Sequence, residues 1–381
     1  MTQTSTTTET TVVFVRSGPL NITPAVGRYV NNLKRAGYPG RIVGIQLAFD
    51  TFKGERERVE VDKMCTFAGQ MGSKARGLMT YIAWQFFQTI QLSRLKPAVV
   101  QFCDVASVVP ALWTKYVHGT KLVFDIRDNV GAGHKSVFTN VLAAIERFAA
   151  KKSDVIIIVR DGRKEFLPRG VEDRIFVIPN TPFHDVEAPA ITHPHPAPMV
   201  INVSGYLGKW RNIPALCAAT RLCKDIKLDV YGNVYDNSTM RHFVDAGVDN
   251  IESIPNDKAL KRMGSADMVA IMYDDRIHIN KYADSNKYYE ALMLGKAVLC
   301  TKMMELAEEV EHYGCGFAVE YDRPDQILEA VSIMKNKGAE VSWNARKLFE
   351  EKYRGLFQSR ALKMYESISL LEKGGRSGFA A

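Results

Sequence analysis

The feature that most constrains the fold is an alternation of short apolar segments with helical patterns, which runs along most of the 381-residue chain. The segments are rich in the β-branched and aromatic residues that favour strands. Such alternation is typical of doubly wound parallel sheets, in which crossover helices cover both faces. The expected strands are 11–15, 41–45, 98–102, 121–126, 154–159 and 174–178, followed by 199–204, 227–231, 251–254, 268–273, 297–300 and 317–319.

A proline-rich stretch divides this alternation into two series. Neither a helix nor a central strand tolerates the four prolines of HDVEAPAITHPHPAP. We therefore expect two tandem Rossmann-like α/β domains that face one another across a cleft lined by the carboxyl ends of their strands. The expected parts are a disordered tail (1–10), an N-terminal domain (11–185), a linker (186–198), a C-terminal domain (199–342), and helices (343–372) that pack back towards the domain junction.

Charge is unevenly distributed along the chain, whose formal net charge is +8. Residues 1–185 contain 25 Lys and Arg against 16 Asp and Glu, whereas the rest of the chain contains 25 against 26. No zinc-finger spacing or RNP-like motif accompanies the basic excess, so we expect no nucleic acid partner. An anionic membrane surface or a phosphorylated lipid fits the basic half, and a generally basic enzyme is the alternative.

The sequence predicts a cytoplasmic protein that can contact the inner face of the membrane. No apolar run approaches ~20 residues, and the segment MTQTSTTTETT lacks the basic and apolar regions of a signal peptide. The six cysteines are scattered without a CxxC pair, which indicates reduced thiols rather than disulfides or a zinc site. No DxD motif is present, so we expect neither a metal nor another cofactor.

Two loops of the first half carry candidate functional residues. Gly18 follows the first expected strand, where it lets the backbone approach a ligand or serves turn geometry alone. After the strand at 121–126 the sequence reads DIRDNVGAGHKS, in which His134 replaces the second glycine of a phosphate loop. Arg127 could bind an anion, Asp128 could accept from a sugar hydroxyl, or the two could form an internal ion pair. His134 could reach an acceptor if its loop folds inward.

Two segments of the second half point to a bound diphosphate. In SGYLGKWRN, Gly205 precedes two cations, Lys209 and Arg211, which either hold phosphates or belong to a solvated loop. In DSNKYYEALMLGKAVLC, a helix begins near Ser285 and Asn286, and its free N–H groups favour an anion. Lys287 and Glu290 share one helix face, as an ion pair or as ligands of a phosphate and a ribose diol.

Together these residues resemble the GT-B glycosyltransferases, and in particular glycosyltransferase family 4. The likeness rests on DSNKYYEALMLGKAVL, DNIESIPNDKALKRMGSADMVAIMY, VSGYLGKWR, SDVIIIV with VIPNTP, and DIRD, the last being similar to a branch that builds bacterial surface polysaccharides. The resemblance implies a UDP- or GDP-linked sugar donor, a lipid-linked or polysaccharide acceptor, and transfer with retention. Glu290 would hold the ribose, Lys209 or Arg211 and residues 285–287 the diphosphate, Gly232 would lie near the base, and Gly18 would approach the diphosphate.

The sequence departs from the family at one position. The family usually carries a second glutamate eight residues before the ribose-binding one, and this chain has Tyr282 there. Two other functions remain open: a relative that hydrolyses or epimerises sugar nucleotides without an acceptor, and a non-catalytic nucleotide-binding relative.

Overall fold

The computed structural model describes residues 10–20, 24–49, 59–69, 74–127, 129–130, 136–182 and 198–371. Contacts within the chain divide it into unit 1 (Met1–Pro179 with Gln358–Ala381) and unit 2 (Asn180–Phe357). The C-terminal segment therefore belongs with the first unit. Nearly all of the expected tail and linker lies outside the described residues.

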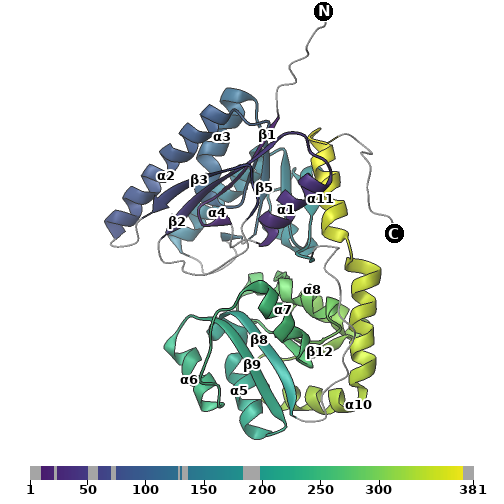
Figure 1. Cartoon of the computed structure of the whole chain (residues 1–381). Coiled ribbons are helices and arrows are strands. Elements are labelled where there is room, and N and C mark those ends of the chain that lie inside the picture. The colour runs from purple at the N-terminus through teal and green to yellow at the C-terminus, as the bar shows by residue number, and fades with distance from the viewer. Residues whose placement is uncertain are drawn as a thin grey trace, which may run out of the picture. The chain divides into compact units, whose positions relative to one another are not determined.

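Unit 1 is built on a seven-stranded parallel sheet (Figure 1). Its order is β3-β2-β1-β4-β5-β6-β7, which reverses direction between β1 and β4. Open α/β sheets bind ligands at the carboxyl ends of the strands beside such a switch point. The strands are β1 (Thr11–Arg16), β2 (Arg41–Phe49), β3 (Lys63–Gly69), β4 (Val99–Phe102), β5 (Lys121–Asp125), β6 (Val155–Ile158) and β7 (Ile175–Val177).

Five α-helices of unit 1 lie in the described residues: α1 (Pro24–Arg35), α2 (Lys74–Leu95), α3 (Val108–His118), α4 (Val137–Lys152) and α11 (Leu356–Ser367). α2, α3 and α4 contribute Trp84, Ala111 and Ala149 to one buried cluster with Val13 and Val15 of β1. These three helices therefore cover the same face of the sheet. α11 packs with α1, since the rings of Tyr29 and Tyr365 meet edge to face at 6.3 Å.

Unit 2 is built on a five-stranded parallel sheet of order β12-β11-β10-β8-β9, which reverses direction between β8 and β10. Buried hydrophobic clusters fill the space between this sheet and its helices. The strands are β8 (Met199–Leu207), β9 (Ile226–Val234), β10 (Met268–Ile271), β11 (Ala297–Thr301) and β12 (Gly316–Val319). The helices are α5 (Ile213–Leu222), α6 (Asn237–Asp245), α7 (Asn256–Gly264), α8 (Asn286–Met293), α9 (Glu305–His312) and α10 (Pro324–Leu348).

The predicted α/β class and its two parallel sheets are confirmed, with differences at three elements. The expected strand at 251–254 is wrong: the segment is irregular, joined to the sheet by a bond from the Gly232 N–H to the Glu252 carbonyl (2.8 Å), and Pro255 follows it. β3 was not expected, because this edge strand buries only Cys65 and lacks a continuous apolar run. α10 runs unbroken through residue 343, where separate C-terminal helices were expected to begin.

No helix in the described ranges combines the length and apolar character needed to cross a membrane.

Candidate active site

Two glycines meet at the carboxyl ends of β8 and β9 in unit 2. Gly205 and Gly232 are direct partners in the parallel register, and their φ angles are +97° and +133°. A Cβ on Gly232 would lie 2.0 Å from the Gly205 carbonyl oxygen, so no side chain fits there. The strand ends therefore present bare backbone, as the close approach of a ligand requires.

The side chain of Lys287 extends over this pair of glycines. Its Nζ lies 3.0 Å, and its Cε 3.2 Å, from the position that a Cβ on Gly205 would occupy. Within the described part of the chain the Lys287 ammonium forms no ion pair, so the pairing with Glu290 considered from the sequence does not occur there. A cation without a carboxylate partner beside bare backbone is suited to an anionic ligand.

Glu290 lies in the same helix, α8, near the end of β9. Burial raises the pKa of Tyr231 on β9, and the charge of Glu290 adds to this effect. The Glu290 carboxylate accepts no hydrogen bond and forms no ion pair within the described ranges. Its oxygens therefore remain available to a pair of hydroxyl donors.

The start of α8 is held in place from inside unit 2. Asp284 accepts hydrogen bonds from the Asn180 N–H (2.9 Å) and the Tyr289 hydroxyl (2.5 Å). Ser285 is the N-cap residue and its side chain makes no capping hydrogen bond, while Asn286 is the first helical residue. Because α8 begins beside the carboxyl ends of the strands, its N-terminal N–H groups add positive potential to that of Lys287.

Lys209 and Arg211 follow β8 but have different surroundings. Lys209 is exposed and has no ion pair in the described residues. Arg211 is buried, donates to the Tyr273 hydroxyl (3.3 Å) and the Ala270 carbonyl (3.4 Å), and lies 4.6 Å from the Tyr273 ring centroid. These contacts give Arg211 internal partners, so Lys209 is the better candidate for a phosphate.

Tyr282 occupies a short 3-10 helix, His278–Tyr282, that precedes α8. Its ring is buried and packs edge to face against His278, with 5.9 Å between centroids. An aromatic side chain therefore fills the position where the family usually has a sugar-facing carboxylate.

Unit 1 has a pocket of about 220 Å³ at its own switch point. Residues at or just after the ends of β1, β4 and β5 line it, among them Arg16, Asp104 and Arg127, together with Glu146 of α4. Asp104 accepts hydrogen bonds from the Ser17 N–H (2.7 Å) and the Ser107 hydroxyl (3.0 Å). Burial raises the pKa of both Asp104 and Glu146. The hydrogen bonds that each carboxylate accepts partly oppose this increase. Carboxyl groups with raised pKa in a pocket are candidates for proton transfer.

Arg127 forms an ion pair with Asp125, the fully buried last residue of β5, at 2.5 Å. Asp125 also accepts from Gln101 (3.3 Å), and the Gln101 side-chain oxygen accepts from the Tyr365 hydroxyl (2.7 Å). Burial by itself lowers the pKa of Arg127 and the negative charge of Asp125 raises it, and the pKa of Arg127 is raised overall. Arg127 thus has an internal partner, although Asp125 rather than Asp128 supplies it.

The remaining predicted residues of unit 1 are less informative. Asp128 and His134 lie outside the described residues. Gly18 is described, and a Cβ there would make an ordinary 3.6 Å contact with Nε of Arg16. The backbone itself does not require glycine at this position.

The sequence reasoning missed Asp104, Asp125 and Glu146. Asp104 and Asp125 stand at or just after the ends of short apolar strands, the same signal that marks Arg127 and Asp128 in the sequence. Glu146 lies within a helix of otherwise ordinary composition, and no local pattern marks it as a pocket residue.

Comparisons with known proteins agree with this architecture. Residues 22–181 match the family model of the glycosyl transferase 4-like domain. No curated protein sequence matches the chain. Among solved structures, the chain is similar to a sucrose-phosphate synthase from Thermosynechococcus elongatus (TM-score 0.70, 14% identity, covering 95% of this chain and 99% of that one).

Two further solved structures are similar in fold. The Anabaena protein HepE, in complex with UDP and glucose, has a TM-score of 0.68 at 13% identity over 95% of this chain and 100% of that one. A UDP-N-acetylglucosamine 2-epimerase has a TM-score of 0.61 at 12% identity over 98% of this chain and 100% of that one. At such identities the likeness establishes the fold alone, and the family model carries the functional assignment. The chain is therefore a glycosyltransferase, which has the GT-B fold and carries a glycosyl transferase 4-like domain over residues 22–181.

Proposed function

We propose that this glycosyltransferase takes its sugar from a nucleotide sugar held by unit 2 and transfers it, with retention, to a lipid-linked or polysaccharide acceptor held by unit 1. One observation carries the donor site: the Lys287 ammonium lies over Gly205 without a carboxylate partner in the described part of the chain. A structural ion pair would have neutralised that charge within the protein.

The donor is held by three kinds of contact. Lys287, Lys209 and the N–H groups at Ser285 and Asn286 face the diphosphate, which needs fixed positive charge. Glu290, about one helical turn beyond Lys287, accepts from the two hydroxyls of the ribose. The backbone at Gly205 and Gly232 lets the nucleotide approach the strand ends.

The same groups promote the reaction. The bond between the anomeric carbon and the diphosphate oxygen breaks, the acceptor oxygen bonds to that carbon, and the proton of the acceptor hydroxyl passes to the departing diphosphate. Negative charge grows on the departing nucleoside diphosphate, and Lys287 with the start of α8 stabilises it. The hydrogen bond between Asn180 and Asp284 fixes the start of α8 in advance. The charged groups there therefore need not reorganise during the reaction.

The acceptor side is assigned to the pocket of unit 1. Asp104 and Glu146 are its carboxyl groups, and Arg16 adds positive charge for an acceptor that carries phosphate. Asp128 and His134 remain further candidates for contact with the acceptor hydroxyl. Arg127 acts as a positioning residue through Asp125.

Uridine is the base that we favour over guanosine. The fold is similar to that of HepE, whose structures contain UDP with glucose and UDP-glucose. A thermal-shift screen of UDP, GDP, ADP and dTDP at equal concentrations tests this choice, because a ligand that binds the folded chain stabilises it more as the ratio of its concentration to its Kd rises. The largest shift should come from UDP, and no shift with any of the four would contradict the donor site.

A second function, hydrolysis or epimerisation of a sugar nucleotide without an acceptor, is favoured by the similarity to a UDP-N-acetylglucosamine 2-epimerase. The two are separated by following release of nucleoside diphosphate with and without a lipid-linked or polysaccharide acceptor. Transfer predicts that release depends on the acceptor. Release at the same rate in its absence would indicate hydrolysis, and altered sugar on an intact nucleotide would indicate epimerisation.

A further inference from the structure

The solvent-facing side of α3 is apolar. Val109, Trp113, Tyr116 and Val117 follow the spacing i, i+4, i+7, i+8, which places them on one side of the helix. Each of these side chains is at least half exposed. The solvent-facing side of a surface helix ordinarily carries polar or charged residues, whereas that of α3 carries apolar ones.

α2 carries a matching stripe. Met79, Ile82, Phe86 and Ile90 recur every three or four residues and are exposed, Phe86 by 67%. The opposite side of this helix already buries Trp84 in the core, so the exposed stripe is not needed for folding of unit 1. α2 and α3 lie side by side (Figure 1), and the Trp113 indole N–H donates to Ser93 of α2 (3.1 Å). The two stripes are therefore continuous.

α4 extends the apolar surface on the other side of α3. Val137, Val141 and Phe148 are exposed by 83%, 53% and 50% and lie on one side of the helix. α3 contacts both α2 and α4. Exposed apolar side chains on three adjacent helices form a contiguous patch of the kind that marks a protein or membrane contact. We call this patch, made by the outer stripes of α2, α3 and α4, the apolar face.

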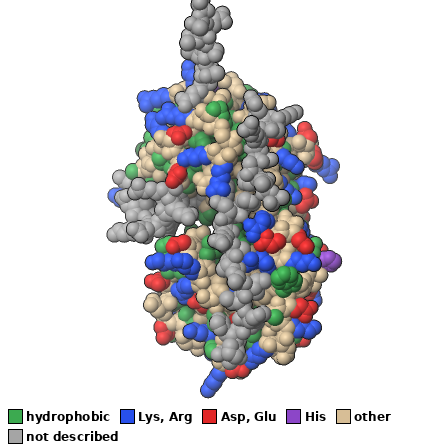
Figure 2. Space-filling model, turned by 45° about the vertical axis from the view of Figure 1, so that its right-hand side comes forward, with side chains coloured by type: hydrophobic (Ala, Val, Ile, Leu, Met, Phe, Trp, Pro, Cys, Tyr) green, Lys and Arg blue, Asp and Glu red, His purple; other side chains and the backbone are tan. Residues whose placement is uncertain are grey.

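The exposed charges on the described parts of the three helices of the apolar face have one sign. α2 and α3 contain no Asp or Glu, and the only carboxylate of α4, Glu146, is 5% exposed. Arg76 and Arg94 of α2 and Arg147 of α4 are exposed. By contrast, the face drawn in Figure 2 intersperses Lys and Arg with Asp and Glu side chains. The apolar face is thus set among cations without carboxylates at the surface of its helices.

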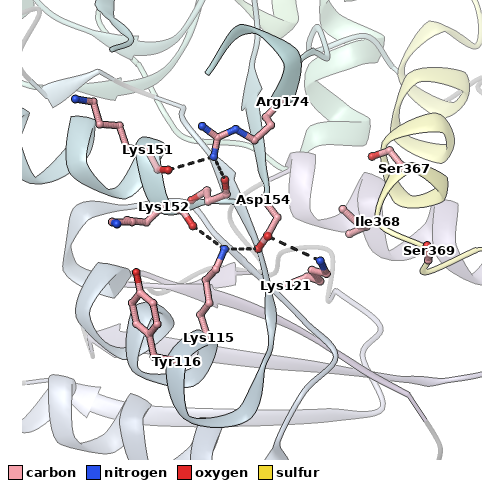
Figure 3. A pocket seen from close by; sticks show the side chains of 11 residues that line it. Lys115, Tyr116, Lys121, Lys151, Lys152, Asp154, Arg174, Ser367, Ile368 and Ser369 are labelled. Carbon is pink, nitrogen blue, oxygen red and sulfur yellow. Dashed lines mark hydrogen bonds and ion pairs between the residues drawn. The ribbon is translucent and has the colours of Figure 1, made fainter. Parts of the chain in front are cut away.

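A basic pocket of about 480 Å³ adjoins the C-terminal ends of α3 and α4 (Figure 3). It is lined by Lys115, Lys121, Lys151, Lys152 and Arg174 around one carboxylate, Asp154. Asp154 accepts from Lys115 at 2.8 Å, and Lys121 lies 4.0 Å from it.

Two cations of this pocket remain without a carboxylate. Lys151 and Lys152 are exposed and form no ion pair in the described residues. Tyr116 lines the pocket and also belongs to the stripe of α3, so the apolar face continues into it.

We propose that the apolar face and the basic pocket together dock the protein on an anionic lipid bilayer. Apolar side chains would enter the boundary between headgroups and acyl chains, and the lysines would meet anionic headgroups. A second copy of this chain is a poorer occupant, because a symmetric contact would set two carboxylate-poor, Lys-rich surfaces against each other. The docking is peripheral, since none of the three described helices can cross a membrane.

Membrane docking does not depend on which nucleotide unit 2 binds. It would bring the enzyme to the bilayer that holds a lipid-linked acceptor, and this consequence rests on the proposed function. Docking is tested by flotation of the full chain with two kinds of vesicle, pure phosphatidylcholine and equal parts of phosphatidylcholine and phosphatidylglycerol. We expect binding to the anionic vesicles that falls as salt rises. Equal binding to both kinds, or to neither, would overturn the proposal.

A matched pair of variants locates the contact. Phe86→Glu removes an exposed aromatic side chain from the apolar face, and Trp343→Glu removes one from α10 of unit 2, where exposure is similar at 62%. Loss of one buried Phe corresponds to roughly tenfold weaker partitioning or more. Phe86→Glu should therefore bind anionic vesicles at least about tenfold less, with Trp343→Glu unchanged. Unchanged binding of Phe86→Glu, or its conversion of a dimer into a monomer in sedimentation velocity, would contradict membrane docking.

Tryptophan fluorescence gives a second readout that does not depend on a disruptive substitution. Trp113 is half exposed on the apolar face, so lipids brominated in their acyl chains should quench part of the emission of the bound protein. Trp113→Phe should remove the quenched part, and Trp343→Phe should leave it. Quenching that survives in Trp113→Phe would place the contact elsewhere.

Discussion

Each unit has a cation at the carboxyl edge of its sheet, and the two cations differ in whether a carboxylate pairs with them. In unit 1, Arg127 is paired with the fully buried Asp125, which in turn is tied to Gln101 and Tyr365. In unit 2, Lys287 lies over the glycines of β8 and β9, without an ion pair in the described residues. Arg127 comes just after β5 and Lys287 lies at the start of α8, and both looked like anion ligands in the sequence.

The difference teaches that a place at the carboxyl edge of a sheet does not by itself make a cation a ligand. What distinguishes the two cations is whether a carboxylate lies within reach inside the same unit. The substitutions below therefore measure different quantities in the two units: removing Arg127 should cost stability, and removing Lys287 should cost affinity.

The largest expected effect is on the stability of unit 1. Arg127→Ala would leave the Asp125 carboxylate buried without its cation, and breaking a buried pair in this way costs about 3–5 kcal/mol. Urea unfolding followed by circular dichroism measures the loss. Arg127→Ala with Asp125→Ala should be less destabilised than Arg127→Ala alone, because no unpaired charge remains. A stable Arg127→Ala with weakened acceptor binding would reassign Arg127 to the ligand.

The next effect contrasts the glycines of the two units. Gly232→Ala would set a Cβ against the Gly205 carbonyl at φ +133°, and backbone strain of this kind costs roughly 1–3 kcal/mol before the clash is counted. Gly18→Ala makes only a 3.6 Å contact and should change stability by less than about 0.5 kcal/mol. Thermal unfolding of both variants measures the two losses of stability. Equal losses would contradict the claim that only Gly232 requires glycine.

A smaller effect concerns affinity in unit 2. Lys287→Ala removes a charged contact to the diphosphate, and hydrogen bonds to charged groups are worth ~1.5–3 kcal/mol. UDP should bind at least about tenfold more weakly by calorimetry, with the unfolding midpoint nearly unchanged. Lys261→Ala, an exposed lysine on α7 of the same unit, is the control and should bind UDP normally. Equal affinities of the two variants would mean that Lys287 does not touch the diphosphate.

The smallest effect is on the pH dependence of unit 1. Because burial raises the pKa of Asp104, the folded chain binds that proton more tightly than the unfolded chain. The contribution of Asp104 to stability is therefore most favourable at acid pH and declines as pH rises from about 4 through the raised pKa. Asp104→Asn should flatten this decline in urea unfolding at a series of pH values. Curves that stay parallel for variant and wild type would show that Asp104 titrates normally.

The two sheets were readable from the sequence because parallel strands buried on both faces form continuous apolar runs. β5 and β6 are buried along nearly their whole length and were expected, whereas the edge strand β3 is mostly uncovered and was not. The strand expected at 251–254 failed because alternating Ile and polar residues before Pro255 also suit an irregular segment. The local sequence pattern therefore identifies buried central strands well and edge strands poorly.

The candidate residues of α8 were predictable from the sequence because Ser285, Lys287 and Glu290 lie close together around one helix start, whereas Gly205 and Gly232 lie on separate strands. The pocket of unit 1 was not predictable, since Asp104, Asp125 and Glu146 come from separate elements and gain their environment from tertiary packing. The burial of Arg211 against Tyr273 likewise depends on a residue 62 positions away. Sequence spacing cannot show that such a cation already has a partner.

The most direct test of the central claim is a calorimetric cycle on Glu290, with UDP and its 2′,3′-dideoxy analogue titrated into the wild type and Glu290→Ala. If Glu290 accepts from the ribose diol, the wild type should prefer UDP by about tenfold or more, and Glu290→Ala should bind both ligands alike. Glu308→Ala, an exposed carboxylate on α9, should keep the wild-type preference. A folded Glu290→Ala variant that still prefers UDP as strongly as the wild type would contradict the placement of the nucleotide in unit 2.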